Sequence, residues 1–248
     1  NILIISLLDI MDRDKPLLTH THQGQILTGG FGLLLLGLVS LSFSIGDRLP
    51  SFGWIGVYSF GFLAIYIISI RTIFLYEKHR METEEPDDET HEISNPKLYY
   101  LYGFNALLVI ASATYLPHIG EEIARITGLG QTFVGSLFIA FSTSLPEVVV
   151  SVSAMRIGAV DMAVGNVMGS NLFNIGILAV DDLFYTKGPL LSGVTFSHQI
   201  TAIAAMVMTT IAIIGLIYRS ETKKHFISGV ALAIAVVYLA ATFLLSQI

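Results

Sequence analysis

The residues of this chain that could do chemistry are polar side chains set inside two long apolar segments. The segment 135–154 contains the run Ser-Thr-Ser-Leu-Pro-Glu, which ends at Glu147, and the segment 161–182 contains Gly-Asn-x-x-Gly-Ser-Asn-x-x-Asn. Carboxylate, hydroxyl and amide oxygens are the donors that hard cations such as Ca²⁺ and Na⁺ prefer. The two segments therefore predict a cation site built from oxygen atoms.

Helical spacing groups these donors on common faces. In the first segment, polar residues recur four apart, and a further hydroxyl stands three residues before the carboxylate: Thr143, Glu147, Ser151 and Ser144. The second segment repeats the four-residue spacing with Asn166, Ser170 and Asn174. Small polar residues also form ordinary contacts between membrane helices. We favour that simpler interpretation for Ser136, Ser151, Ser153 and Asn171.

Glu147 carries the strongest functional signal. A carboxylate at bilayer depth costs about 3 kcal/mol on insertion scales, so it needs a compensating partner. Pro146 has no amide hydrogen and crowds the carbonyl of Ser142, which is expected to bend the helix and to leave backbone oxygens unpaired. We therefore interpret Glu147 as a cation ligand.

The elements that position these residues are membrane-spanning helices. Hydrophobic residues make up 53% of the 248 residues and charged residues only 13%, with a mean hydropathy of +0.71, which argues against a soluble domain. A spanning helix needs roughly 20 mostly apolar residues. Such blocks, preceded by a shorter apolar piece at 1–10, lie at 24–46, 52–76, 98–118, 129–155, 157–184, 196–218 and 225–247. We expect an all-α membrane protein.

An internal repeat relates the two ends of the chain. An offset of 173 positions aligns the first and last 75 residues without a gap, and the identical pairs include Asn1/Asn174, Asp9/Asp182, Pro16/Pro189 and Leu17/Leu190. The two copies are expected to run in opposite directions, as in the inverted repeats of secondary transporters, whose substrate site lies between the repeats. The partners of residues 98–173 would precede Asn1. The whole protein would then have five plus five helices, of which about seven and a half are present.

Charge predicts the orientation and the domain boundaries. Alternating the loops puts ten Lys and Arg residues on one side of the membrane and three on the other. Because basic residues favour the cytoplasmic side, the segment 77–97 is expected in the cytoplasm and the C-terminus outside. Residues 1–76 would be the rest of the first repeat, 77–97 an acidic linker, and 98–248 the second repeat.

The two polar blocks also carry a family resemblance. They resemble the alpha-2 repeat of the cation/calcium exchanger superfamily, whose motif runs G-T-S-L-P-E and then G-N-x-x-G-S-N-x-F-N. In this chain the blocks are 141–147 and 165–174, within a motif region at 135–174. The resemblance covers essentially the whole chain. It implies a sodium/calcium-exchanger-type protein of prokaryotic type, in the plasma membrane, lacking most of its alpha-1 repeat.

Carried over by position, the resemblance implies a set of metal ligands around a central carboxylate shared by the calcium and sodium sites: Glu147, Thr143, Ser144, the carbonyl of Ala140, Ser170, Asn174 and, from the first repeat, Asn1. There are two departures from the family pattern. Ser142 replaces the usual Gly of the motif, and Asn stands at both Asn1 and Asn174, where calcium exchangers often have one Asp. The site then carries less negative charge, which leaves the selectivity and the coupling ion open.

These features predict a secondary antiporter that exchanges Ca²⁺ for Na⁺ by alternating access. A proton-coupled exchanger of Ca²⁺ or another divalent cation is the nearest alternative, and a non-transporting or inactive membrane protein is the alternative from another class. The expected partners are the lipid bilayer and the transported Ca²⁺ and Na⁺ (or H⁺). The sequence shows no nucleotide loop, catalytic triad or basic nucleic-acid patch, so we expect no enzyme activity, cofactor, ATP or nucleic acid. It implies no oligomer.

Charged and titratable residues outside the two polar segments are given simpler interpretations than cation binding. His20 and His22 are expected to be surface residues. Asp181 and Asp182, near the end of their span, would either attract cations or sit at the membrane interface. Asp161 could pair with Arg156.

Overall fold

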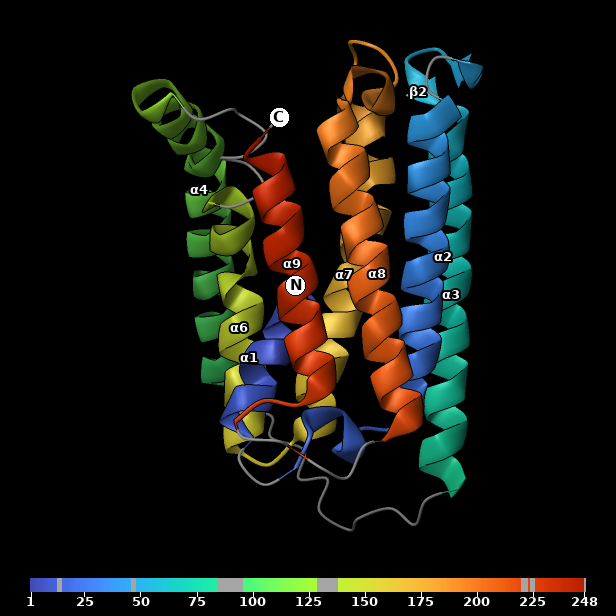
Figure 1. Ribbon diagram of the computed structural model, residues 1–248. Helices are drawn as coiled ribbons and strands as arrows, with labels where there is room; N and C mark the ends of the chain where they lie inside the picture. The colour runs from blue at the N-terminus through green and yellow to red at the C-terminus, as the bar shows by residue number, and fades with distance from the viewer. Residues whose placement is uncertain are drawn as a thin grey trace. The chain divides into compact units, whose positions relative to one another are not determined.

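The described part of the chain is almost entirely helical. The computed structural model describes residues 1–12, 15–45, 48–83, 96–128, 138–219, 223 and 226–247. Its helices, in chain order (Figure 1), are α1 (Leu3–Met11), α2 (Gly24–Ile45), α3 (Val57–Thr83), α4 (Pro96–Thr127), α6 (Ala140–Arg156), α7 (Val160–Phe184), α8 (Phe196–Tyr218) and α9 (Gly229–Leu245). Two 3₁₀ turns, η1 (Leu17–His20) and η4 (Leu190–Gly193), follow α1 and α7. The short strands β1 (Ser51–Phe52) and β2 (Ile55–Gly56) form an antiparallel hairpin before α3.

The membrane-spanning character predicted from the sequence is confirmed for much of the chain. Among the described residues, α2, α3, α7 and α8 are long and apolar enough to cross a bilayer, and α9 is a shorter apolar helix. The expected span at 98–118 lies within the longer α4, whose apolar stretch is interrupted by Asn105 and several tyrosines. The expected span at 129–155 falls partly outside the described residues, and its remainder forms α6.

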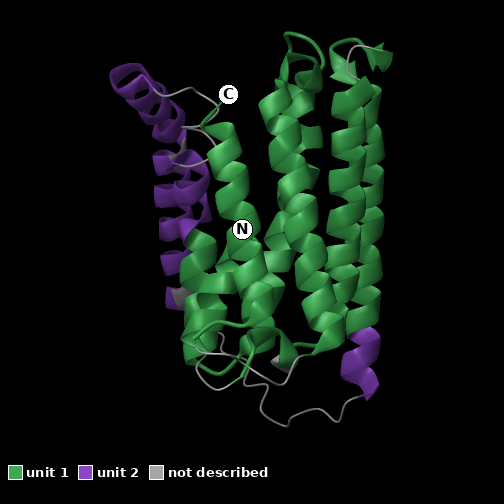
Figure 2. Ribbon diagram, in the orientation of Figure 1, with its two compact units in different colours: residues 1–77, 146–248 green, residues 78–145 purple. Residues whose placement is uncertain are grey.

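The chain divides into two compact units (Figure 2). Unit 1 comprises residues 1–77 and 146–248, and unit 2 comprises residues 78–145. The divisions fall inside α3, after Glu77, and inside α6, before Pro146. Unit 1 thus contains helices from both stretches that the repeat analysis assigned to separate copies.

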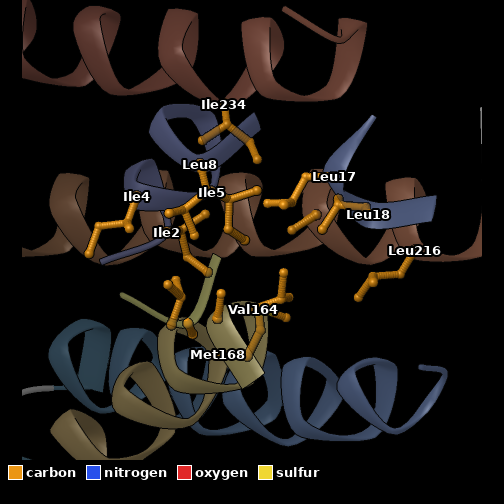
Figure 3. Close-up of a cluster of buried hydrophobic side chains, with 14 residues drawn as sticks. Ile2, Ile4, Ile5, Leu8, Leu17, Leu18, Val164, Met168, Leu216 and Ile234 are labelled. Carbon is orange, nitrogen blue, oxygen red and sulfur yellow. The ribbon is translucent and has the colours of Figure 1, made fainter. Parts of the chain in front are cut away.

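A buried apolar cluster joins both ends of the chain within unit 1 (Figure 3). It combines α1 and η1 from the start of the chain with α6, α7, α8 and α9 from its end, through Ile5, Leu8, Leu17, Val164, Met168, Leu216 and Ile234 among others. A second cluster unites α2, α3 and α7 around Leu35, Phe62 and Leu172. Lipid tails are as apolar as leucine, so close packing rather than removal from water holds such helices together.

Glycines permit close approach at two of these helix contacts. A Cβ atom at Gly29 of α2 would lie 2.5 Å from Met168 of α7, and one at Gly176 of α7 would lie 2.8 Å from the ring of Tyr66 on α3. Both distances are below those that side chains tolerate, so neither neighbour could hold its present place beside a larger residue.

Candidate cation site

Two of the predicted ligands meet where the start of the chain contacts α7. The side-chain amide of Asn1 donates a hydrogen bond to Ser170 Oγ at 2.9 Å, and Ser170 Oγ donates to the carbonyl of Val167 at 3.1 Å. Asn1 and Ser170 are 169 positions apart in the sequence. The contact therefore brings a residue of each predicted repeat to one place.

Glu147 belongs to the same neighbourhood. It follows Pro146 on α6, which continues through the proline, and its side chain is half-buried. Its main-chain carbonyl accepts a hydrogen bond at 3.2 Å from Asn166 of α7, one turn before Ser170. Unit 1 therefore contains Glu147 on α6 and Ser170 on α7, with Asn1, which precedes α1, bound to Ser170.

Asn166 connects the helix that carries the carboxylate with α7. Its side-chain amide donates to the main-chain carbonyl of Glu147 at 3.2 Å and to Ser151 Oγ at 3.0 Å, while Ser151 Oγ donates to the carbonyl of Ala163 at 3.2 Å. The sequence analysis placed Asn166 among the polar residues of the segment 161–182 but not among the ligands. Its place one turn before Ser170 was the available signal for a role in the site.

The remaining predicted ligands are described separately. Asn174 lies one turn after Ser170 on α7 with an exposed side chain. Thr143, Ser144 and Ala140 belong to unit 2, and there the Thr143 hydroxyl donates to the carbonyls of Ile139 and Ala140 at 3.0 and 3.2 Å. Coordination by these four residues stays a prediction.

The donor set of the site is mostly neutral. Within the described ranges, no group of three or more His, Cys, Asp or Glu side chains could hold a metal ion. One carboxylate with amide, hydroxyl and carbonyl oxygens still offers the hard donors that Ca²⁺ and Na⁺ accept.

A cavity of about 650 Å³ opens beside Asn166, between α2, α3, α6 and α7. Its polar lining includes Asn166, Thr28, Gln25, Asp161 and Glu77. Asp161 also accepts a hydrogen bond at 2.8 Å from the backbone N–H of His22, instead of the pairing with Arg156 that the sequence suggested. The His22 side chain is exposed, as expected of a surface residue, and nothing is described of the His20 side chain.

Asp182 does not fit either interpretation made from the sequence. Its side chain is fully buried, whereas its neighbour Asp181 is exposed. A cation-attracting or interfacial aspartate would be in contact with water. Besides the nearby N–H of Leu190, Asp182 accepts from the N–H of Gly56 and the hydroxyl of Ser59, more than 120 positions away, which the local pattern could not reveal.

Four of the described helices are long and apolar enough to span a membrane, which defines an all-α integral membrane protein. A carboxylate and neutral oxygen atoms at a helix contact form its candidate ion site. The family model described as sodium/calcium exchanger protein matches residues 97–246. The chain therefore belongs to the sodium/calcium exchanger family, as the resemblance predicted.

Three relatives illustrate the similarity. Sodium/calcium exchanger MaX1 of Methanosarcina acetivorans is 42% identical over 78 residues, which cover 31% of this chain and 22% of the relative. Uncharacterized membrane protein MJ0091 of Methanocaldococcus jannaschii is 31% identical over 156 residues, covering 61% and 49%. Putative antiporter CaxA of Alkalimonas amylolytica is 41% identical over 68 residues, covering 27% and 21%. The matches thus span half of each relative's length or less. No solved structure matches the chain.

Proposed function

We propose that this protein exchanges Ca²⁺ for Na⁺ across the membrane by alternating access. The observation that carries the proposal is the contact of α7 with two elements inside unit 1: Asn166 of α7 binds the carbonyl of Glu147, and Ser170, one turn on, binds Asn1 of the other predicted repeat. A carboxylate kept among apolar helices needs a partner, and a transported cation is one.

The coupling of the two fluxes follows from a shared ligand. Glu147 binds either one Ca²⁺ or sodium ions, never both, so that release of one ion permits binding of the other. The amide and hydroxyl oxygens of Asn1 and Ser170 complete the coordination without adding charge, and Thr143, Ser144, Ala140 and Asn174 are proposed as further ligands. Because the ion gradient drives the exchange, no ATP is consumed.

The names of relatives support this class of substrate. MaX1 is named a sodium/calcium exchanger, CaxA a putative antiporter, and a chicken protein that is 27% identical over 115 residues is named sodium/potassium/calcium exchanger 1. We propose further that the segment 77–97 lies in the cytoplasm of a prokaryotic cell and the C-terminus outside. The reason is that ten of the thirteen Lys and Arg residues fall on the side of the segment 77–97, and basic residues favour the cytoplasmic side.

A proton-coupled exchanger is the second candidate. It is favoured by the low charge of the site, since Asn stands at both Asn1 and Asn174. In that case Glu147 is protonated in the return step, and cation flux depends on pH and not on sodium.

The deciding experiment is ⁴⁵Ca²⁺ uptake into vesicles under imposed Na⁺ and H⁺ gradients. It uses the full-length protein that contains this chain, because the matches cover half of each relative's length or less. We expect uptake driven by an outward Na⁺ gradient, abolished by Glu147→Gln and unchanged by Glu82→Gln, an exposed glutamate of α3 paired with Lys78. Sodium-independent uptake that follows the pH gradient would replace the sodium proposal with the proton one. Equal uptake by Glu147→Gln and the wild type would refute both.

A further inference from the structure

Two buried aspartates end the helices that lead to the candidate site. Asp9 lies near the end of α1 with 1% of its surface exposed, and Asp182 lies near the end of α7 with none exposed. They stand 173 positions apart, the offset that aligns the repeat. Each follows its own repeat's asparagine, Asn1 or Asn174, by eight residues.

One oxygen of each carboxylate binds the turn that follows its own helix. Asp9 Oδ1 accepts a hydrogen bond from the N–H of Leu17 at 2.9 Å, and Asp182 Oδ1 accepts one from the N–H of Leu190 at 2.6 Å. Leu17 and Leu190 are themselves a repeat pair, and each begins a 3₁₀ turn directly after a proline. The identical residue pairs at the offset of 173 therefore form the same structural motif, which occurs once in each repeat.

The other oxygen of each carboxylate accepts hydrogen bonds from residues that are distant in the sequence. Asp9 Oδ2 accepts from the N–H of Ser228 at 2.7 Å, and Ser228 is the N-cap of α9. Asp182 Oδ2 accepts from the N–H of Gly56 at 2.8 Å, the residue that precedes α3, and from Ser59 Oγ at 2.5 Å. Both carboxylates thus lie at a helix N-terminus, where the helix dipole favours negative charge. The result is that α1 is bound to α9, and α7 to α3.

The two sites differ in how the negative charge is compensated. Lys223 Nζ lies 3.5 Å from Asp9 Oδ2 and also donates to the carbonyls of Asp9 and Asp12. Asp182 instead receives the hydroxyl of Tyr58 at 3.1 Å, besides that of Ser59. Both carboxylates are therefore fully satisfied without an ion, which makes them unsuited to be ligands themselves.

We infer that Asp9 and Asp182 are positioning residues that set the depth of the ion-site helices α1 and α7 against α9 and α3. Eight helical residues correspond to about 12 Å along the axis, and a packed helix transmits a shift at one end to the other. Neither aspartate touches the site, yet cation affinity depends on both. The inference rests on the proposed function, because the affinity in question is that of the exchanged cation.

The test compares Asp182→Asn with Asp181→Asn, the same chemical change at an exposed neighbour. Equilibrium ⁴⁵Ca²⁺ binding to the purified full-length protein gives the half-saturating concentration, and vesicle uptake gives the maximal rate. We expect Asp182→Asn to raise half-saturation about tenfold and to change the maximal rate less than about twofold, because the ligands stay present but are displaced. Asp181→Asn should change neither. A folded Asp182→Asn protein with wild-type half-saturation would overturn the inference.

A second measurement reads the helix position without any transport. The chain contains no cysteine, and a Cβ at Gly169 of α7 would meet no atom within 4 Å, on the wall of the cavity beside Asn166. In a Gly169→Cys background, Asp182→Asn should change the rate of labelling by a water-soluble thiol reagent, and Asp181→Asn should not. If the wild type neither binds nor transports Ca²⁺ while labelling still responds to Asp182→Asn, the proposed function fails and the positioning role stands. An unchanged labelling rate contradicts the positioning role.

A milder variant covers the case in which Asp182→Asn does not fold. Ser59→Ala removes the 2.5 Å bond to Asp182 Oδ2 and leaves the bond from Gly56 in place. We expect about a threefold rise in half-saturation, as one charge-assisted hydrogen bond is lost from the set. Wild-type half-saturation and labelling in this variant would count against the inference in the same way.

Discussion

The side-chain amide of Asn166 on α7 donates to the main-chain carbonyl of Glu147 on α6, at 3.2 Å. The same amide donates to Ser151 Oγ, one turn further along α6. Two bonds from one side chain therefore hold the turn that bears the carboxylate, immediately after Pro146. Proline weakens the helix at this turn by removing a backbone bond, so an external donor is especially useful there.

Asn166→Ala should lower both the stability of the protein and its affinity for the cation. The loss of two hydrogen bonds between membrane helices costs about 1 kcal/mol in total, because each contributes about 0.6 kcal/mol on average. Half-saturation for Ca²⁺ should rise, since the Glu147 turn is no longer held against α7. Thermal unfolding in detergent and ⁴⁵Ca²⁺ binding measure the two effects.

The matched control is Asn171→Ala. Asn171 lies on the same helix and is half-buried, and its side chain is interpreted as an ordinary helix contact. Asn171→Ala should leave the affinity for the cation unchanged, because the role of Asn166 is specific to Glu147. Equal losses of affinity in the two variants would show that α7 simply tolerates no truncation here.

Ser170→Ala should weaken cation binding about tenfold, since it removes one proposed ligand and the acceptor for the Asn1 amide. Ser170→Thr keeps the hydroxyl and should retain most of the affinity. Ser153→Ala is the control, because that hydroxyl is exposed and bonds only within its own helix, to Val149. Binding that is unaffected by Ser170→Ala would remove Ser170 from the ligand set.

The sequence predicted the membrane helices and the family because both depend on local pattern. Apolar blocks of spanning length and the two polar motifs can be read within a few turns of chain, and the spanning helices and the family match agree with them. The two polar segments also predicted Glu147 and Ser170 as ligands, which stays a prediction. The contact between Asn1 and Ser170 needed the repeat as well, since spacing cannot join residues 169 positions apart.

The sequence could not predict which distant backbone amides donate hydrogen bonds to the buried carboxylates. Asp182 looked like an interfacial residue because its partners Gly56, in β2, and Ser59, in α3, are distant in the sequence. Asp161 was matched with Arg156 by proximity in the chain, whereas its partner is the amide of His22. In both cases the sequence identified the aspartate that accepts the hydrogen bond. The group that donates to it depends on how the helices pack, which the sequence does not show.

Lys223→Met should destabilise the protein by about 3 kcal/mol, because it leaves the Asp9 carboxylate buried without its cation. The double change Lys223→Met with Asp9→Asn removes both charges and should recover about half of that loss. Lys78→Met is the control, since its pair with Glu82 is mostly exposed and such pairs contribute about 0.5 kcal/mol. Denaturant or thermal unfolding of the wild type, Lys223→Met, Asp9→Asn and the double variant gives the coupling energy. Additive effects of the two changes would mean that Lys223 and Asp9 do not compensate each other.

Gly176→Ala should destabilise the contact between α7 and α3 by about 1–3 kcal/mol, because the new Cβ would lie 2.8 Å from the ring of Tyr66. Gly169→Ala on the same helix is the control: its Cβ meets no atom within 4 Å, and alanine is the better helix former by about 1 kcal/mol. The two variants should therefore move the unfolding temperature in opposite directions. Adding Tyr66→Leu to Gly176→Ala should restore part of the stability, since it removes the ring that the methyl group strikes. A Gly176→Ala protein as stable as the wild type would mean that α3 can move away from α7 at little cost.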